Sequence, residues 1–266
     1  MLDCTAIILT YNEELNIQQC VDSVSDFCKR IVVIDSFSTD STIEIAKKMG
    51  CDVFQHEFIS HSKQFIYGLE NTGISTEWVL RIDADERITD AAKSEIISKL
   101  NGNSNYNGVV IPFEVNFLGK KLKHGGAYPF RKLILFKKQY AYMEDKKMDE
   151  HIVLTEGKSL IIKSICEHHD NKDLKTWLHK HVDYAFKEAD DAELLLARSA
   201  GFKDKKRTAY YRLPSFIRAK LYFIYRYFFK LGFLDGKAGR YFALLQAYFY
   251  RIEVEAALYE KKVKKQ

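Results

Sequence analysis

Residues 78–86 read Trp78-Val79-Leu80-Arg81-Ile82-Asp83-Ala84-Asp85-Glu86, a mostly apolar run that ends in three carboxylates. Short apolar runs bounded by polar residues are typical of buried strands in a parallel sheet. Side chains alternate along a strand, so Asp83 and Asp85 would project to the same side if the strand continued that far. Neighbouring carboxylates repel each other, and a hard divalent cation such as Mg²⁺ or Mn²⁺ would relieve that repulsion. The alternative is a polar strand end that runs into a solvated turn.

Short β-type runs alternate with helix-like segments throughout residues 1–100. The runs cover residues 5–10, 31–34, 52–54 and 78–82. This alternation predicts an α/β fold, with a mostly parallel sheet and crossover helices. The second run ends at Asp35, so this acid and the Asp83/Asp85 pair should meet at one edge of the sheet. Open α/β sheets bind their ligands at the carboxyl ends of the strands, which makes that edge the expected ligand site.

The loop after the first run favours a nucleotide site without a glycine-rich phosphate loop. Its sequence, Thr10-Tyr11-Asn12-Glu13, contains neither the G-x-G-x-x-G of dinucleotide sites nor a Walker lysine. A bound diphosphate would therefore need another source of positive charge. A metal ion held by Asp83 and Asp85 would provide it.

The composition of the 266 residues is that of a globular protein with one large domain or a domain plus an appendage. A net charge of +5 is too small to argue for a nucleic-acid partner, and we expect none. The five cysteines form no C-x-x-C pair, which favours buried, reduced thiols and a cytoplasmic location. We expect no signal peptide, and no apolar stretch approaches the roughly 20 residues of a membrane span.

The middle of the chain contains a second group of polar residues. Residues 107–117 and 131–138 are predicted strands, and the basic, glycine-rich stretch 119–126 between them is either a solvated hairpin tip or a phosphate or acceptor contact. Further on, His168 and His169 are adjacent, so a strand would point them to opposite faces and make them poor joint ligands. We expect one of the two at the ligand edge and the other in a structural role.

The C-terminal residues 171–266 are predicted to be helical, with a basic and aromatic character. Between residues 216 and 230, arginines and lysines are interleaved with aromatic side chains, and acids are absent. Basic amphipathic helices of this kind bind anionic membrane surfaces, here the inner face of the cell membrane. The alternative is that the aromatic side chains pack on the preceding domain.

Three motifs in this order resemble those of family 2 glycosyltransferases with the GT-A fold. They are Ile7-Ile8-Leu9-Thr10-Tyr11-Asn12-Glu13, Val32-Val33-Ile34-Asp35-Ser36-Phe37-Ser38-Thr39-Asp40, and the stretch 78–86. Within that family the chain is similar to bacterial enzymes that build lipopolysaccharide core, O-antigen or other surface glycans. The resemblance implies a GT-A domain over residues 1–170, with a nucleotide-sugar half (1–100) and an acceptor half (101–170), followed by the helical extension 171–266.

The resemblance also implies a role for individual residues. Thr10, Asn12 and Glu13 would line the nucleotide pocket, Asp35 would meet the uracil or ribose, and Asp83 would lie near the ribose and diphosphate. Asp85 would bind Mn²⁺ or Mg²⁺. Further expected contributors are Gln64 in the nucleotide pocket, Glu150 with Asp149 in catalysis, and His151, Arg131, Lys63 and His168 at the diphosphate or acceptor.

The function that the resemblance implies is the inverting transfer of a hexose from a UDP-sugar to a lipid-linked glycan acceptor. Glu150 would be the general base that takes the proton of the attacking hydroxyl. Two alternatives stay open from the residues alone. One is a phosphatase of the haloacid dehalogenase type, which also uses D-x-D but normally has Thr or Val where Arg87 stands. The other is a non-catalytic protein that binds membrane surfaces.

Overall fold

The computed structural model describes residues 1–102, 105–144, 150–197 and 214–264. The chain forms two compact units. The first consists of Met1–Val115 and Pro129–Asn171, and the second of Asn116–Tyr128 and Lys172–Gln266. The short segment Asn116–Tyr128 therefore groups with the C-terminal helices, although it lies within the predicted acceptor half.

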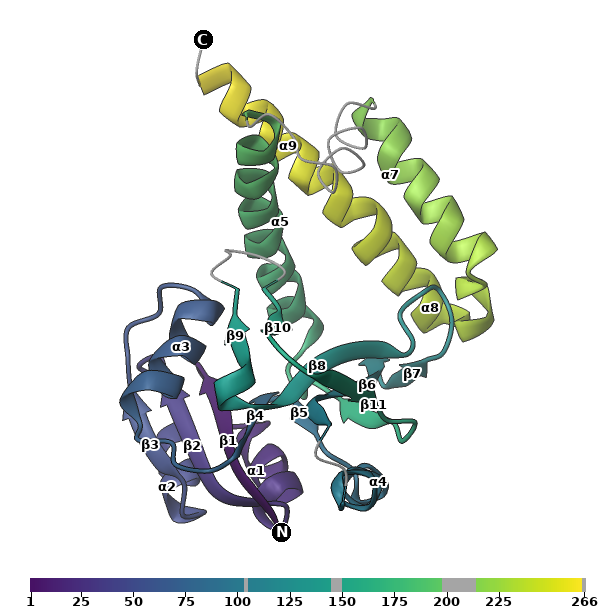
Figure 1. Ribbon diagram of the computed structural model, residues 1–266. Helices are drawn as coiled ribbons and strands as arrows, with labels where there is room; N and C mark the ends of the chain where they lie inside the picture. The colour runs from purple at the N-terminus through teal and green to yellow at the C-terminus, as the bar shows by residue number, and fades with distance from the viewer. Residues whose placement is uncertain (103–104, 145–149, 198–213, 265–266) are drawn as a thin grey trace. The chain divides into compact units, whose positions relative to one another are not determined.

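A mixed, mostly parallel sheet forms the centre of the first unit (Figure 1). Among the described residues this sheet has ten strands, in the order β3-β2-β1-β4-β8-β6-β12-β5, with β7 and β11 paired to β6. The strands β1 to β4 run parallel, and β8 joins β4 and β6 in antiparallel fashion. The strands of the chain are β1 (Leu2–Thr10), β2 (Cys28–Asp35), β3 (Asp52–Gln55), β4 (Trp78–Asp83), β5 (Glu86–Arg87), β6 (Tyr106–Phe117), β7 (Lys120–Leu122), β8 (Phe130–Lys137), β9 (Ala141–Met143), β10 (Ile152–Leu154), β11 (Lys158–Ile161) and β12 (Cys166–His168).

Helices connect the parallel strands, as the alternating pattern predicts. Those of the first unit are α1 (Ile17–Ser25), α2 (Thr42–Lys48), α3 (His61–Asn71), α4 (Asp90–Leu100) and the short η1 (Lys138–Tyr140). In α1 the apolar residues at helical spacing, Ile17, Cys20, Val21 and Val24, are all buried. Ser60 caps α3 by accepting a hydrogen bond from the backbone nitrogen of Lys63. The order strand, helix, strand through β4 confirms the predicted α/β architecture.

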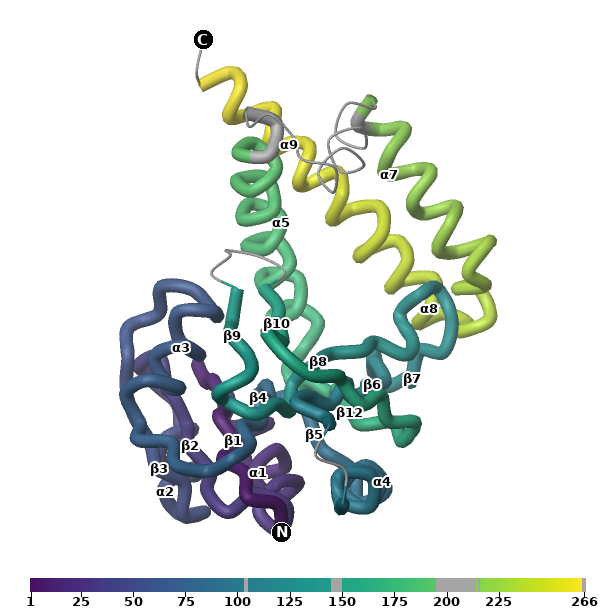
Figure 2. The backbone as a smooth tube through the Cα atoms, in the orientation of Figure 1, coloured from purple at the N-terminus to yellow at the C-terminus, as the bar shows by residue number. Residues whose placement is uncertain are grey.

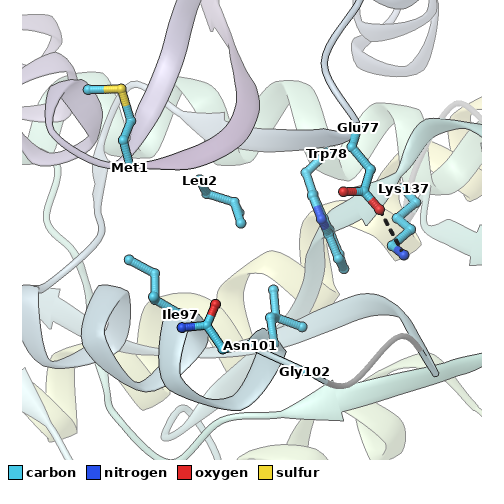
Figure 3. Close-up of a pocket in the computed structure, with 9 residues that line it drawn as sticks. Met1, Leu2, Glu77, Trp78, Ile97, Asn101, Gly102 and Lys137 are labelled. Carbon is cyan, nitrogen blue, oxygen red and sulfur yellow. Dashed lines mark ion pairs between the residues drawn. The ribbon is translucent and has the colours of Figure 1, made fainter.

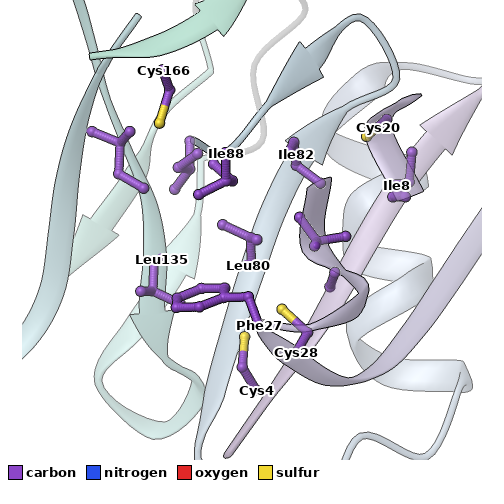
Figure 4. Close-up of a cluster of buried hydrophobic side chains, with 14 of the residues drawn as sticks. Cys4, Ile8, Cys20, Phe27, Cys28, Leu80, Ile82, Ile88, Leu135 and Cys166 are labelled. Atoms are coloured by element: carbon purple, nitrogen blue, oxygen red, sulfur yellow. The ribbon is translucent and has the colours of Figure 1, made fainter. Parts of the chain in front are cut away.

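Alternation along the central strands divides the core of the first unit between the two faces of the sheet. Ile8 and Leu80 belong to one buried cluster (Figure 4), whereas Ile7 and Val79 belong to the other. Both β1 and β4 are thus buried on both faces, as parallel central strands require. All five cysteines lie in described parts of the chain, where they are buried free thiols, as their apolar contexts predict.

Apart from β7, the second unit is helical. Its helices and helical turns are α5 (Leu174–Ala197), α7 (Ser215–Ile224), the π-helical turn η2 (Tyr225–Phe229), the 3₁₀ turn η3 (Gly232–Asp235), α8 (Gly236–Phe242), the π-helical η4 (Ala243–Phe249) and α9 (Tyr250–Lys264). Three alanines of α5 pack with Tyr250, Val254 and Leu258 of α9 in one buried cluster. Within the described residues, none of the helices combines the length and the apolar character needed to cross a bilayer.

Candidate functional site

The acid-ended strands meet at one edge of the sheet, as predicted. In the parallel register Thr10 pairs with Asp35, and Leu9 of the same strand pairs with Asp83. The three carboxyl ends of β1, β2 and β4 are therefore neighbours (Figure 1). Asp35 and Asp83 come from strands on either side of β1, and the loops that follow these strands define the candidate site.

Asp35 ties the loops after β1 and β2 together. Its buried carboxylate accepts hydrogen bonds from Thr10 Oγ1 at 2.9 Å and from the backbone nitrogen of Ser38 at 2.8 Å. Ser38 Oγ in turn accepts from the backbone nitrogen of Asn12 at 2.8 Å, and Asn12 Oδ1 accepts from Thr39 N at 2.8 Å. Asn12 has a φ of 52°, a left-handed conformation that asparagine tolerates better than most residues. The predicted residues Thr10, Asn12 and Asp35 thus belong to one hydrogen-bond network in the loops after β1 and β2.

Asn16, which the motifs do not single out, connects Glu13 to a distant part of the chain. Its fully buried amide donates to Glu13 Oε2 at 2.8 Å and to Asp170 Oδ1 at 2.9 Å. Its carbonyl oxygen accepts from the backbone nitrogen of Asn171 at 2.9 Å. Glu13 also donates its own backbone N–H to Thr42 Oγ1 at 2.7 Å. Asn16 therefore orients the Glu13 carboxylate, and no local sequence signal could reveal its link to Asp170 and Asn171, which lie more than 150 residues away.

Gln64 lies at the ends of β2 and β3, where it contacts other protein groups. Its buried amide donates to Ser36 Oγ at 2.7 Å and to the carbonyl oxygen of His56 at 3.0 Å. Its carbonyl oxygen also contacts His56 Nδ1. These contacts make Gln64 a support for the loop after Asp35. The preceding Lys63 is exposed in the first turn of α3.

The D-x-D segment is not one continuous strand. β4 ends at Asp83 and a turn precedes β5, so the alternation argument does not extend to Asp85. The Asp85 backbone oxygen accepts from His169 N at 2.9 Å and from Arg87 Nη1 at 3.1 Å. The Asp85 carboxylate faces another group, and its Oδ2 lies 3.2 Å from His168 Nε2. Of the adjacent histidines, His168 thus reaches the ligand edge, whereas His169 contributes its backbone.

Lys132 of β8 is a central residue of the site that sequence reasoning missed. Its Nζ donates to Asp83 Oδ2 at 2.9 Å and also contacts Glu86 Oε1, and Glu86 has a side chain only 1 % exposed. Glu86 Oε2 accepts from the backbone nitrogen of Asp83 at 3.2 Å. The ammonium lies 5.7 Å from the ring centre of Phe113 and 5.5 Å from that of Phe130. One cation therefore bridges two carboxylates beneath the D-x-D turn.

The pKa values of Asp83, Lys132 and His168 are set by charge interactions that outweigh burial, whereas burial dominates at Glu86. Burial alone would raise the pKa of Asp83, but the charges of Lys132 and Arg81 outweigh it and lower that pKa. Burial would lower the pKa of Lys132, yet the two carboxylates raise it. For Glu86, burial dominates and raises the pKa, and the Asp83 charge adds to this effect. Burial would also lower the pKa of His168, but the Asp85 carboxylate raises it.

The bridging role of Lys132 leads to a stability prediction. We expect Lys132→Met to lower the free energy of unfolding by roughly 3 kcal/mol, because it leaves Glu86 and Asp83 without their cation. Adding Glu86→Gln should restore part of this loss. The matched control is Lys93→Met, which removes a lysine whose partners Asp26 and Asp90 are 65 % and 94 % exposed and which should cost at most about 1 kcal/mol. Urea unfolding measures all three, and equal losses for the two lysines would contradict the bridge.

The residues predicted on the acceptor side differ in burial and in contacts. Glu150 Oε1 lies 3.4 Å from Nη2 of Arg81 on β4, and both side chains are largely buried. His151 is 70 % exposed, with its Nδ1 3.4 Å from Glu144 Oε2. Arg131 is exposed on β8, and Asp149 lies outside the described residues. The structure therefore connects Glu150, through Arg81, to the strand that ends in Asp83.

The donor set fits a divalent ion that takes only a few ligands from protein. Asp85 Oδ2 and His168 Nε2 are close together, and both atom types bind Mn²⁺. Across the described ranges, no group of three or more His, Cys, Asp or Glu side chains is arranged to hold a metal. Mg²⁺ and Mn²⁺ commonly complete their coordination with water and substrate phosphates. Asp85 and His168 therefore suit a divalent ion that binds together with a phosphate-bearing substrate.

A cavity of about 500 Å³ lies at the opposite edge of the sheet (Figure 3). Leu2 and Trp78, which begin β1 and β4, line it together with Ile97 of α4. Glu77 and Lys137 form an ion pair of 2.9 Å at its border. Because it is at the amino ends of the strands, this cavity is separate from the acid-ended edge.

Comparisons with known proteins identify the family of this chain. The model of glycosyl transferase family 2 matches residues 5–170. An uncharacterized glycosyltransferase of Rickettsia typhi is 26% identical over 244 residues, covering 86% of this chain and 79% of that protein. The lipopolysaccharide core biosynthesis glycosyltransferase LpsC of Rhizobium meliloti is 34% identical over 104 residues, 37% of each chain.

One solved structure extends the comparison over nearly the whole chain. The mannosyltransferase PcManGT of Pyrobaculum calidifontis, solved with GDP-Man and Mn²⁺, superimposes with a TM-score of 0.52 at 14% identity. The match covers 98% of this chain and 88% of that one. At this identity the likeness concerns the fold, and it confirms the predicted GT-A architecture with a C-terminal helical region.

Proposed function

This chain belongs to glycosyl transferase family 2 and is a glycosyltransferase, and from this premise we propose that it transfers a hexose with inversion from a UDP-sugar to a lipid-linked glycan. The observation that carries the proposal is the meeting of Asp35, Asp83 and Asp85 at one sheet edge, with Glu150 linked to the same strand. Family membership removes both the phosphatase and the non-catalytic alternatives.

The proposed site for the nucleotide-sugar donor rests on the hydrogen-bond network around Asp35. Thr10, Asn12 and Asp35 would hold the nucleoside, with Glu13 oriented by Asn16 and with Gln64 supporting the adjacent loop. Asp83, fixed by Lys132, would approach the ribose and diphosphate. Asp85, with His168, would hold Mn²⁺ or Mg²⁺. When bound, the ion supplies positive charge that stabilises the diphosphate leaving group.

The acceptor half of the proposal assigns the proton transfer to Glu150. The Arg81 guanidinium lies 3.4 Å from this carboxylate and would hold it in place, and a carboxylate can accept the proton that a general base must take. Glu150 would take the proton of the acceptor hydroxyl as its oxygen attacks the anomeric carbon from the face opposite the diphosphate, which inverts the configuration. Asp149 and His151 would support it. Arg131 and Lys63 would contact the acceptor or the diphosphate.

A lipid-linked acceptor of bacterial surface-glycan synthesis is the proposed second substrate. Two features support it: the similarity to a lipopolysaccharide core enzyme, and the exposed aromatic and basic side chains of the second unit. The protein would then work as a cytoplasmic enzyme bound peripherally to the inner face of the membrane, with no nucleic-acid partner.

Nucleotide-dependent stabilisation tests the donor proposal. We expect UDP-hexoses to raise the melting temperature only when Mn²⁺ or Mg²⁺ is present, with a gain of about 2.7 kcal/mol at a hundred times the dissociation constant. GDP-mannose is the matched competitor and should stabilise less. Chelator should abolish the shift. A larger shift with GDP-mannose would replace UDP in the proposal, and a shift that is independent of metal would remove the ion from it.

A further inference from the structure

The turn between η2 and α8 is built for close packing. A Cβ atom on Gly232 would lie 2.9 Å from the carbonyl oxygen of Arg226 and 3.4 Å from the Cα of Gly125. A Cβ on Gly239 would collide with the carbonyl oxygen of Gly232. Only glycine fits at these two positions, so the path of the turn is closely determined.

Asp235 fastens the basic loop after β6 to this turn. Its carboxylate, 4 % exposed as a residue, accepts from the backbone nitrogens of Lys123 at 3.0 Å and His124 at 2.9 Å, and contacts His124 Nδ1 at 2.9 Å. Arg226 Nε donates to the carbonyl oxygen of Gly125. Both segments belong to the second unit, where β7 and α8 are in contact (Figure 2). We call residues 118–126 and 228–237 together the tip.

The tip exposes large apolar side chains although its backbone is held firmly. Phe229 is 76 % exposed, and Phe233 and Leu234, which lie between the buried Gly232 and Asp235, are exposed as well. Leu118 and Leu231 are also exposed and have φ values of 49° and 58°. Leucine is strained in this conformation, and glycine would be less so. Phe233 makes an edge contact with the ring of Tyr227 at 6.2 Å, yet it and the other four side chains stay at least 42 % exposed.

The charged groups of the tip are almost all positive. Its exposed basic residues are Lys120, Lys121, Lys123, Lys230 and Lys237. The only carboxylate in the two segments is Asp235, which is buried and hydrogen-bonded within the tip. The surface therefore combines aromatic and leucine side chains with an excess of lysines over carboxylates within the two segments. A binding partner for the tip must therefore present an apolar region with anionic groups next to it.

We propose that the tip is the membrane-docking element of this protein, and that it inserts its phenylalanines and leucines into the interface of an anionic bilayer. The lysines would bind lipid phosphates while their hydrocarbon stems lie along the apolar side chains. This inference rests on the proposed action at a lipid-linked acceptor. It places the contact at the turn 228–237 and the loop 118–126, which share only residues 228–230 with the helical stretch 216–230 that the sequence suggests.

Vesicle flotation tests the proposal with matched variants of the full chain. The vesicles contain equal parts of phosphatidylglycerol and phosphatidylcholine, or phosphatidylcholine alone. We expect the double variant Phe233→Ser/Leu234→Ser to bind the anionic vesicles at least about tenfold more weakly than the native chain. The matched control, Tyr259→Ser/Val263→Ser, removes two exposed apolar side chains from α9 of the same unit and should bind normally.

Two lysine substitutions test the electrostatic part of the proposal independently. Lys230→Glu/Lys237→Glu should weaken binding by about fivefold or more for each lysine, and added salt should weaken binding by the native chain. Lys47→Glu/Lys48→Glu on α2 makes the same change in net charge on the first unit and should have little effect. If one tip variant fails to fold, the other decides.

The outcomes separate this inference from the proposed function. Equal losses in tip and control variants, equal binding to neutral vesicles, or no vesicle binding by the native chain would overturn the docking role. Metal-dependent stabilisation by UDP-sugar is measured in the same variants and should be unchanged by the tip substitutions. Failure of that stabilisation in the native chain would instead count against the transferase proposal, whatever the vesicles show.

Discussion

Asp85→Ala is expected to abolish metal-dependent stabilisation by UDP-sugar and to reduce transfer by at least about a thousandfold, or roughly 4 kcal/mol. The carboxylate is the proposed link between protein, ion and diphosphate, and His168 alone is a weak replacement. The fold should survive, because the bonds that Asp85 makes to His169 and Arg87 use its backbone oxygen. Thermal unfolding with UDP-sugar, with and without Mn²⁺, and a transfer assay measure the two effects.

Asp22→Ala is the control for this experiment. Asp22 is an exposed residue on α1 of the same unit, so its loss changes the net charge equally without touching the site. The control should keep both stabilisation and transfer. Full activity of Asp85→Ala would refute the metal assignment, and stabilisation by UDP-sugar that persists with Mn²⁺ would place the ion on other residues.

Glu150→Gln is expected to leave donor binding intact and to lower turnover by about a thousandfold, within the usual range for loss of a general base. The amide keeps the size of the side chain and can still accept a hydrogen bond from Arg81, but it cannot take a proton. Stabilisation by UDP-sugar with Mn²⁺ should therefore match the native protein, while the rate at saturating donor and acceptor falls.

Glu144→Gln is the matched control, because Glu144 is the neighbouring acid that pairs with His151. Its turnover should be close to native. If Glu150→Gln turns over at the native rate, Glu150 is not the base, and Asp149 becomes the next residue to replace. If Glu150→Gln loses donor stabilisation as well, its carboxylate supports the donor pocket and the kinetic loss cannot be assigned to proton transfer.

Local patterns were sufficient to predict the donor edge of the sheet. Strand and helix periods depend on residues a few positions apart, so the runs ending at Thr10, Asp35 and Asp83 could be located without tertiary information. Parallel pairing then brings strand ends of one kind to one edge. The roles proposed for Asp85 and Glu150 come from resemblance to the family and stay predictions until the variants are measured.

The contacts that organise the site could not be read in the same way. Lys132 reaches Asp83 and Glu86 across 49 and 46 residues, because β8 lies beside β4 in antiparallel register. The turn after Asp83, which sends Asp85 toward His168, likewise depends on pairing between β5 and β12. Such contacts are set by which strands become neighbours, and a lysine within a strand has the same local signature whether it is solvated or buried.

The sequence by itself determined the α/β alternation, the acid-ended strands and the basic aromatic character of the C-terminal region. These properties follow from hydrophobic period and composition, which are local. Only the tertiary structure decided that Lys132 neutralises the carboxylates under the D-x-D turn and that Asp235 joins two basic segments into one tip. Both depend on contacts between residues that are far apart in the chain, and their spacing is set only when the strands and helices have packed.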